Sequence, residues 1–309
     1  MLMRALVRDA DQVRLAECPR AQLRPGWMRI RVLLAGICRT DLYAAEGLFP
    51  MTGARTLGHE LAGAVLVASD ASAFRPGDRV TVAPLIPCED CSGCRHTARC
   101  RNPGMLGVDV DGGFADEVVV PESCVVAVPR ELPLRRAAYV EPIAASLAVL
   151  NAPIRPDDRG AILGTGRIAT LTARILAARG FRSVTMLDEG ARAHATRDDL
   201  PFDFVIETSA TEATLRAALR AVRPGGVVVL KSRPAAPVPL QVTRAVHLDV
   251  TLSAVGYGSF ADAVTLAREL DLDDLLGDVF PLESFALAFA RARDANGGPK
   301  LFLAPDGER

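Results

Sequence analysis

The chain has 309 residues, of which 50% are apolar and 24% charged, with a formal net charge of −1. This length exceeds what one hydrophobic core usually organises, so we expect two domains. The near-neutral charge argues against a nucleic-acid partner. No run of about 18 apolar residues occurs, which argues against a membrane segment and favours a cytoplasmic protein.

The first 140 residues are predicted to be mostly β-structure. Short apolar runs are separated by Gly, Pro and Asp turns, and no long helical period interrupts them. The expected strands cover residues 3–7, 28–36, 62–68, 78–83 and 114–120.

From Arg159 the pattern changes to strands that alternate with helices, which is typical of a mostly parallel sheet. Only 14 residues separate Asp188 from Asp203. A crossover helix needs about 10–12 of them, so no further strand fits. We therefore predict a trimmed, five-stranded α/β domain in which the strand ending at Asp188 forms an edge. The expected strands are 161–163, 183–188, 202–207, 224–230 and 248–255, and the expected helices 167–180, 210–222, 260–270 and 282–293, followed by a last strand at 300–305.

A glycine turn joins the first strand of this domain to its first helix. Gly164, Gly166, Arg167 and Ile168 belong to the pattern GxGxxA, in which the glycines permit a tight turn and close approach of a pyrophosphate. Asp188 ends the next strand, where a carboxylate can bind ribose hydroxyls and would repel a 2′-phosphate. These residues predict a dinucleotide site that prefers NAD to NADP. The alternative is a glycine turn in an unrelated α/β sheet.

Four of the seven cysteines lie within thirteen residues, at Cys88, Cys91, Cys94 and Cys100. In a reducing compartment such a cluster favours a metal over disulfides, and four thiolates are the ligand set of a closed structural zinc site. The alternative is a cluster of redox-active or unligated thiols. The isolated Cys18 and Cys124 are expected to be small core residues.

A second, dispersed set consists of Cys38, His59, Glu60 and Glu141. Taken singly, each is ordinary, since an isolated Cys is usually buried packing and a His beside a Glu is usually a structural pair. Together they offer the mixed sulfur, nitrogen and oxygen ligands that an open catalytic zinc site uses.

Six motifs, in chain order GICRTD, LGHELAGAV, PCEDCSGC, GGFADEVVVP, VEPIAAS and GTGRIA, resemble those of the zinc-containing alcohol dehydrogenases of the medium-chain dehydrogenase/reductase family. The resemblance extends from Met3 to about Pro305. It implies a GroES-like catalytic domain formed by residues 1–142 and 256–309, with a Rossmann domain inserted at 143–255.

The resemblance also implies roles for the dispersed residues. Cys38 and His59 match catalytic zinc ligands, and Glu141 matches the remaining ligand position, where a carboxylate is similar to the polyol, sugar and threonine dehydrogenase branches. Glu60 matches an acid that is either an outer partner or an alternate ligand. Which of the two acids is the third ligand stays open at this point.

Three further residues close to Cys38 match family positions. Thr40 corresponds to the hydroxyl that takes the substrate proton, and Arg39 to a cation that contacts the pyrophosphate in some members. Tyr43 stands where many members carry a His that relays the proton, and a phenol with a pKa of about 10 is a poorer relay at neutral pH. The cysteine loop is also about two residues shorter than is usual.

The implied activity is hydride transfer between NAD and a secondary alcohol, polyol or amino alcohol, with one catalytic and one structural zinc. Two alternatives remain: a binding protein that retains only the structural zinc, and an enzyme that uses its cofactor in a non-redox or biosynthetic step. The family's usual pairing implies a homodimer or homotetramer through the strand at 248–255.

Overall fold

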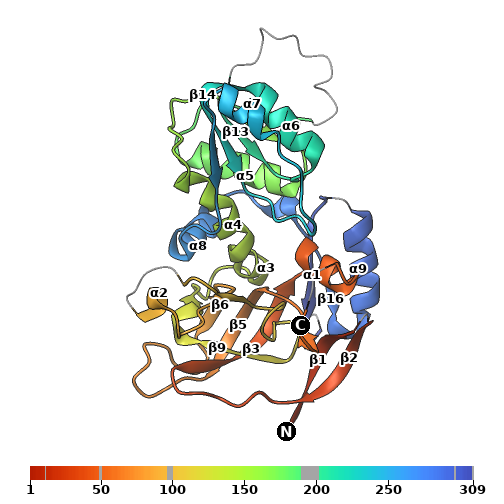
Figure 1. Ribbon diagram of the computed structural model, residues 1–309. Coiled ribbons are helices and arrows are strands. Elements are labelled where there is room, and N and C mark those ends of the chain that lie inside the picture. The colour runs from red at the N-terminus through yellow and green to blue at the C-terminus, as the bar shows by residue number, and fades with distance from the viewer. Residues whose placement is uncertain (11, 49–50, 96–99, 189–201, 296, 308–309) are drawn as a thin grey trace. The chain divides into compact units, whose positions relative to one another are not determined.

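The computed structural model describes residues 1–10, 12–48, 51–95, 100–188, 202–295 and 297–307. The chain forms two compact units, the first made of Met1–Glu141 and Leu276–Arg309, the second of Pro142–Leu275 (Figure 1). The first unit is therefore discontinuous in sequence. No helix among the described residues is long and apolar enough to cross a membrane.

The second unit extends beyond residue 255, where the sequence-based boundary was drawn. Helix α8 (Phe260–Glu269) buries its apolar face, and the segment after it is tied to the unit by an ion pair between Arg174 and Asp274, with Nη1 2.6 Å from Oδ1. Residues 256–275 thus belong to the compact unit that carries the glycine turn.

The first unit is built around a seven-stranded sheet in the order β10-β6-β5-β3-β17-β16, with β9 also paired to β3. A three-stranded sheet, β2-β1-β4, and a two-stranded sheet, β7-β8, complete it. The strands are β1 (Leu2–Asp9), β2 (Gln12–Pro19), β3 (Trp27–Gly36), β4 (Arg55–Thr56), β5 (Glu60–Val67), β6 (Arg79–Val82), β7 (Leu85–Ile86), β8 (Gly104–Met105), β9 (Glu117–Pro121), β10 (Val125–Ala127), β16 (Leu276–Pro281) and β17 (Lys300–Ala304).

Alternation along β3 explains why it lies at the centre of this sheet. Met28, Ile30, Val32 and Leu34 are all at most 2% exposed, at the spacing of two that places side chains on one face of a strand. Met28, Ile30 and Val32 belong to the apolar core cluster of the unit. The helices of this unit are α1 (Arg39–Ala45), α2 (Ser92–Arg95), α3 (Leu134–Ala138) and α9 (Phe285–Asp294).

The second unit contains the predicted five-stranded parallel sheet, in the order β12-β11-β13-β14-β15. The strand before Asp188 is an edge, as predicted. The crossover helix expected between Asp188 and Asp203 lies outside the described residues. The strands are β11 (Gly160–Leu163), β12 (Val184–Leu187), β13 (Phe202–Glu207), β14 (Val222–Leu230) and β15 (Thr251–Ala254), and the remaining helices α4 (Val140–Leu147), α5 (Arg167–Ala178), α6 (Glu212–Ala221) and α7 (Val242–His247).

This sheet has helices on both faces (Figure 1). Ala161 and Leu163 of β11 pack in a cluster with residues of α6 and α7, whereas Ile162 between them packs in a second cluster with residues of α5. Strands buried on both faces are expected to be continuously apolar, which is what the sequence shows at β11.

Glu207, the last residue of β13, ties together the carboxyl ends of two neighbouring strands. Its carboxylate is 1% exposed and accepts four backbone N–H bonds, from Ser209 (3.1 Å) and Ala210 (2.7 Å), and from Lys231 and Ser232 after β14 (both 2.7 Å). Ligands of open α/β sheets bind at this edge. The strand-end loops are therefore fixed before any ligand arrives.

Candidate functional site

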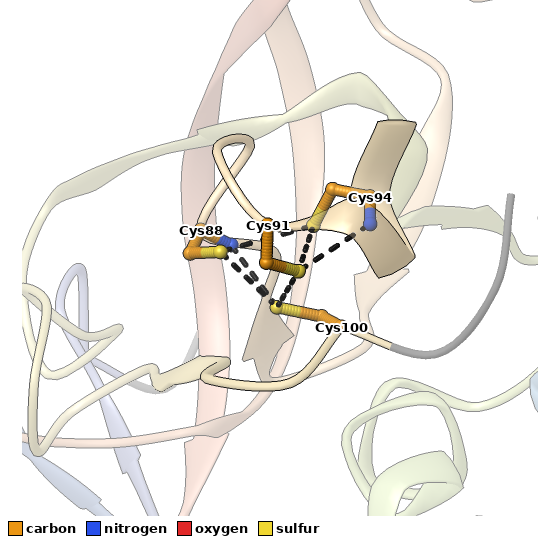
Figure 2. Close-up of side chains that lie close together, drawn as sticks. All are labelled: Cys88, Cys91, Cys94 and Cys100. Carbon is orange, nitrogen blue, oxygen red and sulfur yellow. Dashed lines mark hydrogen bonds between the residues drawn. The ribbon is translucent and has the colours of Figure 1, made fainter. Parts of the chain in front are cut away.

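The four clustered cysteines bring their sulfurs together. The Sγ atoms of Cys88, Cys91, Cys94 and Cys100 all lie within 4.8 Å of one another (Figure 2). The separations are 3.9 Å for Cys88 and Cys94, 3.6 Å for Cys91 and Cys94, 4.0 Å for Cys91 and Cys100, and 3.5 Å for Cys88 and Cys100. Each is far longer than the sulfur–sulfur bond of about 2.05 Å, so the cysteines are thiols.

These distances fit a tetrahedral zinc ion. Four sulfurs bound to zinc at about 2.3 Å would lie about 3.8 Å from one another, within the observed range. The short loop that follows Cys94 therefore still permits the arrangement. A four-sulfur set leaves no open position for a substrate, so the role of this site would be structural.

Backbone N–H groups around the cluster stabilise negative charge on its sulfurs. The amides of Arg101 and Cys94 each donate to Sγ of Cys91 at 3.4 Å, and the amide of Cys88 donates to Sγ of Cys100 at the same distance. The bonds from Arg101 and Cys94 lower the pKa of Cys91 to about 6, whereas burial and the neighbouring sulfurs raise the pKa of Cys94 to about 12. Because thiolates are the form that binds metal, the loop favours a cation.

The second set meets where two strands of the first unit pair. Gly36 at the end of β3 lies opposite Glu60 at the start of β5 in an antiparallel pair. Cys38 follows β3 and His59 precedes β5, so this pairing brings together residues that are far apart in sequence. One ligand atom each from Cys38, His59 and Glu60 lies within 4.8 Å of the others.

Asp41, a residue that the sequence reasoning passed over, organises this second set. Its fully buried carboxylate accepts the amide of Cys38 at 2.8 Å and the amide of Gly58 at 3.1 Å, and its Oδ1 lies 3.5 Å from Nδ1 of His59. A carboxylate beside one imidazole nitrogen leaves the other, Nε2, to bind a metal. The signal was present in GICRTD, because an acid three residues after a helix cap is a capping pattern.

The charge around His59 also fits a cation. His59 is 1% exposed, and burial alone would lower its pKa, but the negative charges of Asp41 and Cys38 outweigh burial and hold the pKa well above its usual range. A buried imidazole surrounded by anionic groups is an environment in which a divalent ion would replace the proton.

Glu60 has a second partner that the sequence did not reveal, Lys300 on β17. Nζ of Lys300 lies 2.6 Å from the Glu60 carboxylate and donates to the carbonyl oxygen of Ile37 at 3.0 Å. Both charged side chains are at most 2% exposed. Nζ lies 2.6 Å from each of the two carboxylate oxygens of Glu60, although only the contact with Oε1 has hydrogen-bond geometry.

Three other predicted residues lie on helix α1, directly after Cys38. Arg39 is exposed at its first position, whereas Thr40 and Tyr43 are half-buried. Thr40 and Tyr43 are three positions apart and therefore share one face of the helix. Their assigned roles in proton transfer stay predictions.

Glu141 lies outside the group formed by Cys38, His59 and Glu60. It is 4% exposed, near the start of α4 at the last position of the first unit. Of the two acids, Glu60 is therefore the one that lies near the Cys38 thiol and the His59 imidazole. A ligand role for Glu141 stays a prediction.

The glycine turn has the predicted local form. Gly164 adopts a φ of +123°, and a Cβ there would lie 2.4 Å from Oγ1 of Thr208, so only glycine fits. Gly166 caps α5, whose first two residues, Arg167 and Ile168, are half-buried.

Asp188 is exposed directly after β12. The amide of Gly164, in the glycine turn, donates to the carbonyl oxygen of Leu187 at 3.0 Å. Asp188 follows Leu187 in the chain, so it comes directly after a residue that is hydrogen-bonded to the turn. Turn, helix start and acid therefore occur together within the second unit, as the dinucleotide interpretation requires.

Comparisons with known proteins agree with this arrangement. Residues 24–130 match the model of the alcohol dehydrogenase GroES-like domain. The chain is 33% identical over 246 residues to D-altritol 5-dehydrogenase of Agrobacterium fabrum, covering 70% of this chain and 71% of that protein. It is 27% identical to L-threonine 3-dehydrogenase of Streptomyces avermitilis, covering 96% and 98% respectively.

A solved structure shows the same fold. The crystal structure of 2R,3R-butanediol dehydrogenase from Bacillus subtilis superposes with a TM-score of 0.84 at 23% identity, over 98% of this chain and 99% of that one. At this identity the likeness establishes the fold alone.

Proposed function

This chain belongs to the zinc-containing alcohol dehydrogenases of the medium-chain dehydrogenase/reductase family, and we propose that it oxidises a secondary alcohol, polyol or amino alcohol with NAD, or reduces the matching carbonyl. The observation that carries the proposal is the buried convergence of Cys38, His59 and Glu60. A thiol, an imidazole and a carboxylate are the ligand types of an open catalytic zinc site. The relatives named D-altritol 5-dehydrogenase and L-threonine 3-dehydrogenase support this substrate class.

Cys38 and His59 would hold the ion, with Glu60 or Glu141 as the third protein group. Zinc there would act as a Lewis acid on the alcohol oxygen, and the nicotinamide would take the hydride. The residues of this chain would orient the reactants. The hydroxyl of Thr40 would take the substrate proton while it passes its own proton on toward solvent, and Asp41 would hold the His59 ring in the orientation that exposes Nε2.

The test is zinc per chain by elemental analysis, combined with NADH formation on a panel of polyols and amino alcohols. Wild-type protein is expected to hold about two ions, and the Cys38→Ser variant about one, because the four-cysteine site is independent of Cys38. NADH formation should disappear in the variant. A single ion in both proteins would contradict the proposal and favour a binding protein with only the structural zinc.

Glu141→Ala tests the second acid. If Glu141 binds the ion, turnover should fall by at least about 100-fold and the second zinc should be lost, since removal of even an outer partner costs about 10–100-fold. Zinc content, turnover and thermal unfolding would be measured beside Glu212→Ala, which removes an exposed carboxylate of α6. Unchanged turnover would remove Glu141 from the site and leave the role to Glu60.

Asp188→Ala tests the cofactor preference. Loss of a charged acceptor for the ribose hydroxyls should weaken NADH binding about ten-fold and shift the ratio of NAD to NADP use toward NADP. Binding constants for NADH and NADPH would be measured by fluorescence titration, with Glu269→Ala on α8 as the control. An unchanged ratio would contradict the assignment of NAD.

We further propose that the protein is a cytoplasmic homodimer or homotetramer. Among the described strands of the second unit, β15 lies at one edge of the sheet. An open edge strand is a ready template for pairing, and a second copy of β15 would cover it. Sedimentation equilibrium tests the assembly, and a monomer at micromolar concentration would contradict it.

A further inference from the structure

The chain uses lysine almost nowhere. Of its 36 cationic side chains, all but two are arginine, the exceptions being Lys231 and Lys300. Lys300 is 1% exposed, and lysine is rarely buried completely unless it is paired. A compact ammonium group on a flexible stem fits a small buried space that a planar guanidinium does not.

The contacts of Lys300 join the two segments that carry the metal-binding residues. Its ammonium group donates to the carbonyl oxygen of Ile37, the residue before Cys38, and pairs with the carboxylate of Glu60, the residue after His59. Lys300 thus bridges the end of β3 and the start of β5 from a third strand, β17, which pairs with β3.

The backbone at Gly36 leaves room for the ion pair between Lys300 and Glu60. A Cβ on Gly36 would lie 2.6 Å from Oε2 of Glu60 and 3.3 Å from Cδ of Lys300. Gly36 has an ordinary backbone conformation, since it is not among the glycines with positive φ. Its lack of a side chain is therefore explained by the space that the ion pair occupies.

We propose that Lys300 is a positioning residue of the metal site. Its ammonium group holds the Glu60 carboxylate near the Ile37 carbonyl oxygen, and this restraint keeps the carboxylate from binding the ion permanently. The inference rests on the proposed function with Glu141 as the third protein group. A carboxylate oxygen of Glu60 lies within 4.8 Å of a ligand atom of Cys38 and of His59, while Nζ of Lys300 lies 2.6 Å from each oxygen of that carboxylate. An unrestrained carboxylate would take the metal position that the substrate oxygen needs.

The test measures the rate at which zinc is transferred to a chromogenic chelator. The relevant kinetic phase is the one that is absent in Cys38→Ser, because that phase reports the ion at the Cys38 site. Lys300→Met should retain two ions and slow this phase about ten-fold, because the released carboxylate binds the metal. In the cobalt-substituted protein, the visible absorption band should shift. Turnover should fall while zinc content does not.

Two further variants separate positioning from general effects. If Lys300 acts through Glu60, adding Lys300→Met to Glu60→Gln should leave the release rate unchanged, whereas the same change in wild-type protein slows it. The matched control is Arg29→Met, which removes a cation from another buried acid, Glu117, near the opposite end of β3.

The outcomes are distinct. The inference would be overturned if Lys300→Met changed the zinc release rate equally in wild-type protein and in Glu60→Gln. It would also be overturned if Lys300→Met had the same release rate as Arg29→Met. Either result would leave the proposed function intact. If Lys300→Met does not fold, the zinc release rate of Glu60→Gln is compared with that of the double variant. A difference between these two rates contradicts the proposal. A single zinc in wild-type protein would instead contradict the catalytic site itself.

Discussion

Replacement of Asp41 by alanine is expected to disable the proposed catalytic centre and to destabilise the first unit. Two amides, the partly buried one of Cys38 and the buried one of Gly58, would lose their acceptor. Each unsatisfied buried donor costs about 1–3 kcal/mol, so the free energy of unfolding should fall by roughly 2–4 kcal/mol. His59 would lose the group that orients its ring, and zinc affinity at this site should drop about 10–100-fold.

Denaturant unfolding, zinc content at limiting zinc and turnover measure these effects together. The matched control is Asp111→Ala, because Asp111 also accepts one backbone amide, that of Thr56 at 3.0 Å, in the same unit. The control should lose some stability and keep its zinc. An Asp41→Ala protein with wild-type zinc affinity would show that the carboxylate serves only the backbone.

The second large effect is expected at the four-cysteine site. Cys100→Ser replaces a thiolate with a hydroxyl that binds zinc poorly, so the chain should fall from about two ions to one. The loop would lose a cross-link that closes thirteen residues, which is worth roughly 3 kcal/mol. The transition on heating should therefore begin earlier.

Zinc content and calorimetry at several zinc concentrations would measure this change. Cys18→Ser is the control, since Cys18 lies outside both candidate groups. It should leave the zinc content at two. Retention of both ions by Cys100→Ser would mean that the sulfurs gather without holding a metal. The loss of activity should also be smaller than in Cys38→Ser, because the four-sulfur site has no open position.

Features encoded by neighbouring residues could be predicted from the sequence. The four cysteines lie within one loop, and their spacing alone indicated a tetrahedral site. The count of 14 residues between Asp188 and Asp203 similarly predicted both the number of strands in the parallel sheet and which strand is an edge. In each case the prediction was possible because a short segment of chain can span only a short distance.

Features that depend on distant pairing were harder to predict. Cys38 and His59 meet only because β3 and β5 pair, and sequence reasoning assigned them through family resemblance. Lys300 lies 263 positions from Ile37, and no local pattern marks it as buried. The rarity of lysine was the only available hint. The sequence-based domain ended at residue 255, whereas the second compact unit continues through α8 to Leu275.

The position of β17 has a consequence for how the protein is made. Strand β17 pairs with β3 and β16 and supplies Lys300, yet the ribosome delivers it only after the entire second unit. Domains generally fold as units during synthesis, so the second unit is complete while the first still lacks a strand. An emerging chain can therefore complete the parallel sheet early, whereas the contacts of Lys300 with Ile37 and Glu60 form only near release.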